Sequence, residues 1–260
     1  MKSFHVGIIG SGNLASHLSK ALSGAGVDVA FILSRNAVKG RAVAKSIGSR
    51  YQTILPTPVK GNNLLFICTS DEAIEEMFHR YKDSGYTLIH CSGMQPLPFY
   101  PERKAGTGVF YPVQSFSKNI TVDWKIIPLC LEASDAATLR LLKKIAGALG
   151  GPVKILSSEQ RAVVHLAAVF ANNFSNAQFA IAAEILHAHQ LPFDLMKPLI
   201  LQTALKVQHH LPAEVQTGPA KRKDKKTIQA HLALLKDSPS TRKIYRELTD
   251  YLLKKYNEEQ

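Results

Sequence analysis

Short apolar runs and amphipathic stretches alternate through the first half of the chain. The apolar runs have the length of buried strands and occupy residues 4–9, 27–33, 64–68, 87–91, 109–113, 128–131 and 153–156. Apolar residues recur with helical spacing over residues 14–23, 38–47 and 136–149. Another helix is predicted to start near Thr69, because Glu72 follows at the spacing of a capping box. This alternation predicts an α/β Rossmann-type doubly wound sheet, mostly parallel and covered on both faces.

The pattern changes after residue 156. Ser157 and Gln160 form a predicted capping box, which opens a helical stretch free of Gly and Pro to about residue 190. Further helices are predicted over residues 193–211, 225–235 and 239–256, the last beginning with Pro at its first position. We therefore divide the chain into an α/β domain, residues 1–155, and an all-α C-terminal domain, residues 156–260.

A Gly-rich loop, GSGNLA at residues 10–15, follows the first predicted strand and opens the first helix. In this pattern the first Gly permits a tight turn and the second lets backbone approach a pyrophosphate. The helix N-terminus adds free N–H groups and a positive dipole end. The predicted dinucleotide contacts here are Gly10, Ser11, Gly12, Asn13 and Leu14. The alternative is a turn in a doubly wound fold that binds nothing.

The end of the second strand selects the nicotinamide cofactor. An NAD site usually carries Asp or Glu there for the ribose 2′-OH, whereas this chain has Ser34 and Arg35. Arg35 can pair with a 2′-phosphate and Ser34 can donate a hydrogen bond. We predict NADP (NADPH) rather than NAD; the alternative for Arg35 is an exposed loop charge. Thr69 and Ser92 follow two later strands and are expected near the ribose or nicotinamide, unless they serve as helix cap and turn residues.

Composition narrows the location and the partners. No apolar run approaches the roughly 18 residues of a membrane span, and no signal-peptide pattern opens the chain, so a cytoplasmic protein is expected. The three cysteines lack C-x-x-C spacing and the histidines lack H-E-x-x-H spacing, so buried reduced thiols and no metal site are predicted. The net charge of +12 suits an anionic small molecule. The basic run 221–226 is interpreted as a solvated loop, and without aromatic residues it argues against nucleic acid.

The glycine loop and the helical second half together resemble the 6-phosphogluconate dehydrogenase-like superfamily. That superfamily includes pyrroline-5-carboxylate reductase, ketopantoate reductase and F420-dependent NADP oxidoreductase. More closely, the chain resembles proteins that join a Rossmann-like domain to a DUF2520 domain. The strings that carry this resemblance are FICTSDEAI (66–74), HCSG (90–93), YPVQSF (111–116), HLAA (165–168) with Asn173, and TGP (217–219) through Arg222 and Asp224 to HL (231–232). The family commonly has Arg-Gly-Asp after TGP, whereas Lys223 here lacks glycine's freedom at positive φ.

The resemblance implies a nicotinamide-dependent oxidoreductase that forms a homodimer through its helical half. Residues 162–171 are almost wholly apolar, which predicts a helix buried on all sides and interrupted by His165. Related reductases place a helical Lys and Asn against the nicotinamide, so His165 is a candidate general acid and Asn173 a substrate-orienting residue. Alternatively, His165 is a structural histidine bonded to an Asn across a domain or dimer interface.

The expected activity is NADP-dependent transfer of hydride to a small anionic carbonyl or imine in the cleft between the domains. The further candidate substrate contacts are Gln114, Thr217 and Arg222, of which Arg222 can pair with a carboxylate or phosphate. The alternative from another functional class is a non-catalytic NADP(H)-binding sensor or regulator. The sequence alone does not identify the substrate.

Overall fold

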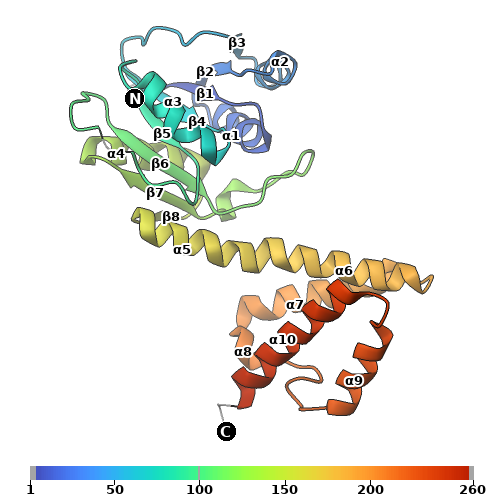
Figure 1. Ribbon diagram of the computed structural model, residues 1–260. Coiled ribbons are helices and arrows are strands. Elements are labelled where there is room, and N and C mark those ends of the chain that lie inside the picture. Colours follow the sequence, from blue (N-terminus) through green and yellow to red (C-terminus); the bar gives the residue numbers. More distant parts are fainter. Residues whose placement is uncertain (1–3, 99, 258–260) are drawn as a thin grey trace. The chain divides into compact units, whose positions relative to one another are not determined.

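The computed structural model describes residues 4–98 and 100–257 (Figure 1). The chain divides into two compact units, Met1–Asn173 and Phe174–Gln260, which are described separately below. The first unit therefore contains the sheet together with the helical segment that follows it. Within the described ranges, no helix combines the length and the apolar character that a membrane crossing requires.

The first unit is built on one eight-stranded sheet in the order β3-β2-β1-β4-β5-β6-β7-β8. Its strands are β1 (Phe4–Ile9), β2 (Asp28–Leu33), β3 (Arg50–Gln52), β4 (Asn62–Ile67), β5 (Thr87–His90), β6 (Thr107–Pro112), β7 (Leu129–Ala133) and β8 (Val153–Ile155). The first six run parallel in the Rossmann order, and only the β6–β7 pairing is antiparallel. The predicted doubly wound, mostly parallel sheet is confirmed. The order reverses between β1 and β4, where such folds bind their ligands.

Helices cover both faces of this sheet (Figure 1). They are α1 (Asn13–Gly24), α2 (Ala37–Ser46), α3 (Ile74–Tyr81) and α4 (Ala136–Leu149). Alternate side chains of β4 enter different cores: Leu64 and Phe66 pack with α1 and α4, whereas Leu65 and Ile67 pack with α3. This is the period-two pattern of a strand buried on both faces. The three cysteines are buried and free, as predicted.

The predicted capping box at Thr69 does not form. A 3₁₀ turn, Asp71–Ala73, precedes α3, and neither terminus has a side-chain cap. The Ala73 N–H donates instead to the Ser70 carbonyl at 3.0 Å, so a backbone turn satisfies the helix start. By contrast, the capping box of Ser157 and Gln160 is present and opens α5 (Ser158–Ala168).

Helical conformation continues from α5 through a π-helical turn, Val169–Phe174, into α6 (Ser175–Ala188). The prediction of a long helix is confirmed, but the prediction that residues 162–171 are buried on all sides is wrong for the single chain. Val163, Leu166 and Phe170 are 68%, 58% and 63% exposed, because α5 buries only the side that carries Arg161 and Val164. An extended apolar surface therefore remains in contact with solvent.

The second unit is wholly helical. Besides α6 it contains a 3₁₀ turn, Phe193–Met196, and the helices α7 (Lys197–His209), α8 (Pro212–Val215), α9 (Lys225–Leu234) and α10 (Pro239–Asn257). Its small core includes Ala220, Ile228, Leu232 and Leu235. The Asp224 carboxylate caps α9 by accepting from the Thr227 N–H at 3.0 Å. The helix predicted over residues 193–211 corresponds to the 3₁₀ turn and α7, whereas the short α8 was not predicted.

Lys223 holds a left-handed conformation, with φ of 56°, in the loop before α9. A non-glycine residue pays about 1–2 kcal/mol there, while glycine loses more backbone entropy on folding, roughly 0.5–1 kcal/mol. We expect Lys223→Gly to raise the free energy of unfolding by about 0.5–1 kcal/mol in urea titrations. The control Lys226→Gly, in the first turn of α9, should lower it by about 1 kcal/mol. Equal losses in both variants would contradict this account.

Candidate functional site

A cleft of about 1210 Å³ lies at the point where the strand order reverses. It is lined by residues that follow β1, β2 and β4. Of the nine predicted cofactor contacts, eight line it: Gly10, Ser11, Gly12, Asn13, Leu14, Ser34, Arg35 and Thr69. Other lining residues include Asn36, Tyr51, Cys68 and Arg80. The fold therefore gathers predicted contacts as much as 59 residues apart, from Gly10 to Thr69, around one cavity large enough for a dinucleotide.

The two loop glycines differ in what surrounds them. Gly10 has φ of 123°, and a Cβ there would lie 2.3 Å from the Cys68 carbonyl oxygen. Gly12 is the N-cap of α1 in an ordinary extended conformation, and a Cβ on it would meet no described atom within 4 Å. Gly10 is thus required by the turn itself. Gly12 leaves space beside the free N–H groups of α1, where an anion can approach the backbone.

The polar side chains around the cleft differ in whether they already form hydrogen bonds within the protein. The Ser11 and Ser34 hydroxyls hydrogen-bond to each other at 2.8 Å, and Ser34 is buried. The Asn13 amide donates to the Phe116 carbonyl at 2.9 Å, so this side chain ties α1 to a distant loop. Arg35 is exposed, and its guanidinium makes no hydrogen bond within residues 4–98 and 100–257. Of these groups, Arg35 is the one positioned to pair with a phosphate in the cleft.

Ser92 is the predicted contact that does not line the cleft. Its buried hydroxyl accepts hydrogen bonds from the N–H groups of Met94 and Gln95, both at 3.0 Å. These contacts match the turn-forming role that the sequence left open. His90, at the end of β5, has its pKa lowered to about 3 by burial and by the positive charge of Arg161. It is fully buried and neutral at pH 7, which excludes it as a proton donor to a ligand.

His165 projects from α5 onto the carboxyl ends of β5 and β6. A Cβ on Gly93, in the loop after β5, would lie 2.7 Å from its Nδ1, so ring and loop are in close contact. The Tyr111 hydroxyl, at the end of β6, lies 3.2 Å from the same Nδ1. Burial raises the pKa of the Tyr111 phenol above its usual value, so it remains protonated. The opposite nitrogen, Nε2, has no hydrogen-bond partner among the residues that the structure describes.

The remaining predicted site residues occupy separate places. Asn173 is exposed in the π-helical turn, and Gln114 is exposed after β6, where its Oε1 accepts from the Ser115 N–H at 2.8 Å. Thr217 and Arg222 are exposed in the loop before α9, within the second unit. Asn173 and His165 both belong to the first unit, where the hydrogen bond of His165 is with Tyr111 and not with Asn173.

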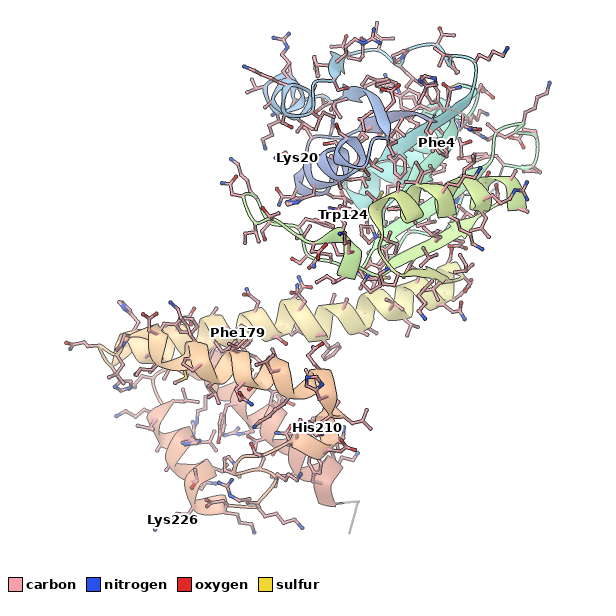
Figure 2. All side chains as sticks on the ribbon, turned by 180° about the vertical axis from the view of Figure 1, so that it is seen from behind. Phe4, Lys20, Trp124, Phe179, His210 and Lys226 are labelled. Atoms are coloured by element: carbon pink, nitrogen blue, oxygen red, sulfur yellow. The ribbon has the colours of Figure 1, made fainter. Side chains whose placement is uncertain are left out.

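A second hollow of about 700 Å³ adjoins the glycine loop, with which it shares Ser11, Gly12 and Asn13. Lys20, Lys39 and Lys118 contribute to its lining, and none of the lining residues is acidic. Trp124 stacks on Phe116 at its edge, with ring centroids 5.5 Å apart. Lys20 and Trp124 are labelled in Figure 2. Some of the excess positive charge of the chain therefore lies next to the predicted phosphate site.

Sequence reasoning missed Arg161, which is 1% exposed and contacts the loop after β5. The available signal was an arginine one helical turn before His165, directly before the apolar stretch 162–171. It was overlooked because an arginine near a helix start is usually solvated.

The sheet order and the glycine loop define a Rossmann-type dinucleotide-binding protein with a helical C-terminal unit. Residues 5–92 match the model of the NADP oxidoreductase, coenzyme F420-dependent family, and residues 127–252 match the domain of unknown function DUF2520. The chain belongs to the family of two-domain proteins that join an NADP-oxidoreductase-type Rossmann domain to a DUF2520 domain.

Solved structures agree with this assignment. A Bacteroides fragilis protein described as a candidate NADP oxidoreductase is 37% identical, with a TM-score of 0.88 over 97% of this chain and 98% of its own. The reductive aminase of Aspergillus terreus, solved with NADPH and ethyl-5-oxohexanoate, shares the fold at 14% identity and a TM-score of 0.70 over 98% and 94%. Pyrroline-5-carboxylate reductase of Coxiella burnetii shares the fold at 16% identity and a TM-score of 0.54 over 97% of both chains. No curated protein gives a significant match. The chain thus has the fold of NADP-dependent oxidoreductases, and its family points to NADP(H) binding.

Proposed function

We propose that this protein is an NADPH-dependent reductase that transfers hydride to a small anionic carbonyl or imine. One observation carries the proposal. The ends of β1, β2 and β4 line the dinucleotide cleft, while the next two strands, β5 and β6, end against His165. A cofactor site and a titratable side chain thus occupy neighbouring strand ends of one sheet edge.

The residues around the cleft fit NADP. The open space at Gly12 and the first turn of α1 suit a pyrophosphate, and the exposed Arg35 suits a 2′-phosphate. Thr69 lies further along the same cleft, where we place the ribose or nicotinamide. Bound there, NADPH supplies the hydride. The chain supplies the phosphate contacts and holds the ring end of the cofactor at the strand ends.

His165 supplies the proton in this proposal. Tyr111 can donate to Nδ1 of the neutral imidazole or accept from Nδ1–H of the imidazolium, so it holds the ring in both protonation states. Nε2 then delivers a proton to the oxygen or nitrogen that becomes basic as the substrate is reduced. Asn173 and Gln114, both in the first unit, are proposed to orient the carbonyl or imine. Thr217 and Arg222 of the second unit stay predicted substrate contacts.

We also propose that the protein is a homodimer through its helical half. The second unit leaves many large apolar side chains exposed, among them Phe174 (48%), Leu195 (56%), Leu199 (61%) and Leu201 (61%). Together with the exposed face of α5, this exceeds the scattered apolar exposure of a monomer. A second copy carries the same apolar surface and so can cover it. Light scattering at micromolar concentration should give twice the chain mass; a monomer would refute the proposal.

The cofactor part is tested by calorimetric titration of NADPH and NADH. Losing a charge-assisted phosphate contact costs about 1.5–3 kcal/mol, so Arg35→Ala should weaken NADPH about 10- to 100-fold and leave NADH unchanged. Arg50→Ala is the matched control, because this exposed arginine begins β3 and does not line the cleft. Equal wild-type affinities for the two cofactors would overturn the NADP assignment.

The reductase part is tested by following NADPH oxidation with a panel of 2-oxo acids and cyclic imines. Turnover of one class identifies the substrate chemistry. Tight NADPH binding without turnover of any member would contradict the reductase and favour a cofactor-binding sensor.

A further inference from the structure

The buried side chain of Arg161 links three parts of the first unit. Its Nε donates to the Ser92 carbonyl at 3.1 Å, and one terminal nitrogen donates to the Gln95 carbonyl. The other terminal nitrogen pairs with the Glu132 carboxylate of β7. One guanidinium on α5 therefore holds both ends of the Ser92–Gln95 turn and anchors it to the sheet.

Ser158 extends this arrangement by one helical turn. Its hydroxyl donates to the Glu132 carboxylate at 3.0 Å and accepts from the Leu97 N–H at 3.0 Å. The carboxylate and the serine thus continue the link from α5 to the segment that follows the turn. The donors of a guanidinium sit on three nitrogens in one plane, so Arg161 reaches two carbonyls and a carboxylate that lie in different directions. The three donors of a lysine share a single nitrogen and do not reproduce this spread.

His165 lies on the same face of α5, because it is four residues after Arg161. The turn that Arg161 holds contains Gly93, whose backbone lies against the His165 ring. The separation between ring and turn is therefore set by the arginine, while Tyr111 sets the ring's direction through Nδ1. The geometry points to Arg161 as a positioning residue for His165. The catalytic consequence of this positioning rests on the proposed function of His165, whereas the contact between Arg161, the turn and the ring does not.

The chain offers a matched control in Arg103. This arginine also donates to backbone carbonyls, those of Ala105, Lys82 and Tyr86, and so holds a loop in the same unit. None of its partners contacts His165. If Arg161 is purely structural, Arg161→Lys and Arg103→Lys should both lower the melting temperature and leave the surroundings of the His165 ring unchanged. If Arg161 positions His165, Arg161→Lys alone should change the surroundings of that ring.

The test compares these two variants in the full chain. The ¹⁵N chemical shifts of the His165 imidazole, assigned by their loss in His165→Gln, report the tautomer and its hydrogen bond to Tyr111. We expect Arg161→Lys to move these shifts and Arg103→Lys to leave them unchanged, with both melting temperatures lowered. On a substrate found as above, Arg161→Lys should lower kcat about 10- to 100-fold with the NADPH Kd within twofold.

A second variant keeps the inference testable if Arg161→Lys does not fold. Gly93→Ala adds a methyl group 2.7 Å from the ring and should move the same imidazole shifts from the side of the turn. Unchanged His165 shifts in a folded Arg161→Lys or Gly93→Ala protein would overturn the positioning role while leaving the reductase proposal intact. If these variants change the His165 shifts but turnover does not depend on His165, the contact is supported. The proposal that His165 is the general acid is then refuted.

Discussion

Gly12→Ala is expected to abolish measurable NADPH binding while the protein stays fully folded. The backbone of Gly12 is in a region open to any residue, and a methyl group there meets no described atom within 4 Å. The substitution therefore costs the fold little. Its methyl group occupies the space that a pyrophosphate needs beside the α1 N-terminus, so the NADPH Kd should rise at least about 100-fold, or about 2.7 kcal/mol. Calorimetry measures the binding, and thermal unfolding without cofactor measures the stability.

Gly10→Ala is the matched comparison, and unlike Gly12→Ala it is expected to lower the stability of the protein without cofactor. Here φ is 123° and the added methyl group would lie 2.3 Å from the Cys68 carbonyl oxygen. Backbone strain of this kind costs about 1–3 kcal/mol before the clash is added, so unfolding without cofactor should occur at lower temperature. If Gly12→Ala bound NADPH like the wild type, the loop would be a turn that binds nothing, as the sequence alone allowed.

The sequence predicted the sheet because its central strands are apolar runs bounded by polar or Gly residues. It missed β3, whose three residues at the sheet edge are too few to show a period. It also gave no sign that β7 runs antiparallel to β6, because strand direction is decided by how the connection folds back and not by local pattern. Lys223 has a left-handed backbone that usually favours glycine, so the surrounding loop overrides the local preference of lysine.

The candidate site was predictable where chain order determines it and unpredictable where distant partners do. The glycine loop and Arg35 follow strands directly, and the fold brings them to one cleft. The amide of Asn13 is engaged by a carbonyl 103 residues away, and the Ser92 hydroxyl by its own turn. Arg161 acquires its role only through Glu132 and the Ser92–Gln95 turn. Such pairings depend on tertiary contacts that no local motif encodes.

The second large expected effect concerns the proton. His165→Ala should lower kcat by about 10²- to 10⁴-fold, the usual contribution of a general acid, while the NADPH Kd stays within twofold, because His165 does not line the cofactor cleft. Tyr111→Phe keeps the ring but removes the hydrogen bond at Nδ1, so it should cost about tenfold through misorientation of the imidazole. Both are measured by NADPH oxidation on a substrate identified from the panel.

The second unit supplies the control for this experiment. His231 pairs with Tyr245 as His165 does with Tyr111: its Nδ1 lies 2.9 Å from the hydroxyl, and the rings are 5.7 Å apart instead of 6.0 Å. His231→Ala should therefore lower stability with kcat unchanged. Equal losses of kcat in His165→Ala and His231→Ala would mean that both pairs only stabilise helices. Each substitution removes one His–Tyr hydrogen bond, and only His165 is proposed to act on the substrate.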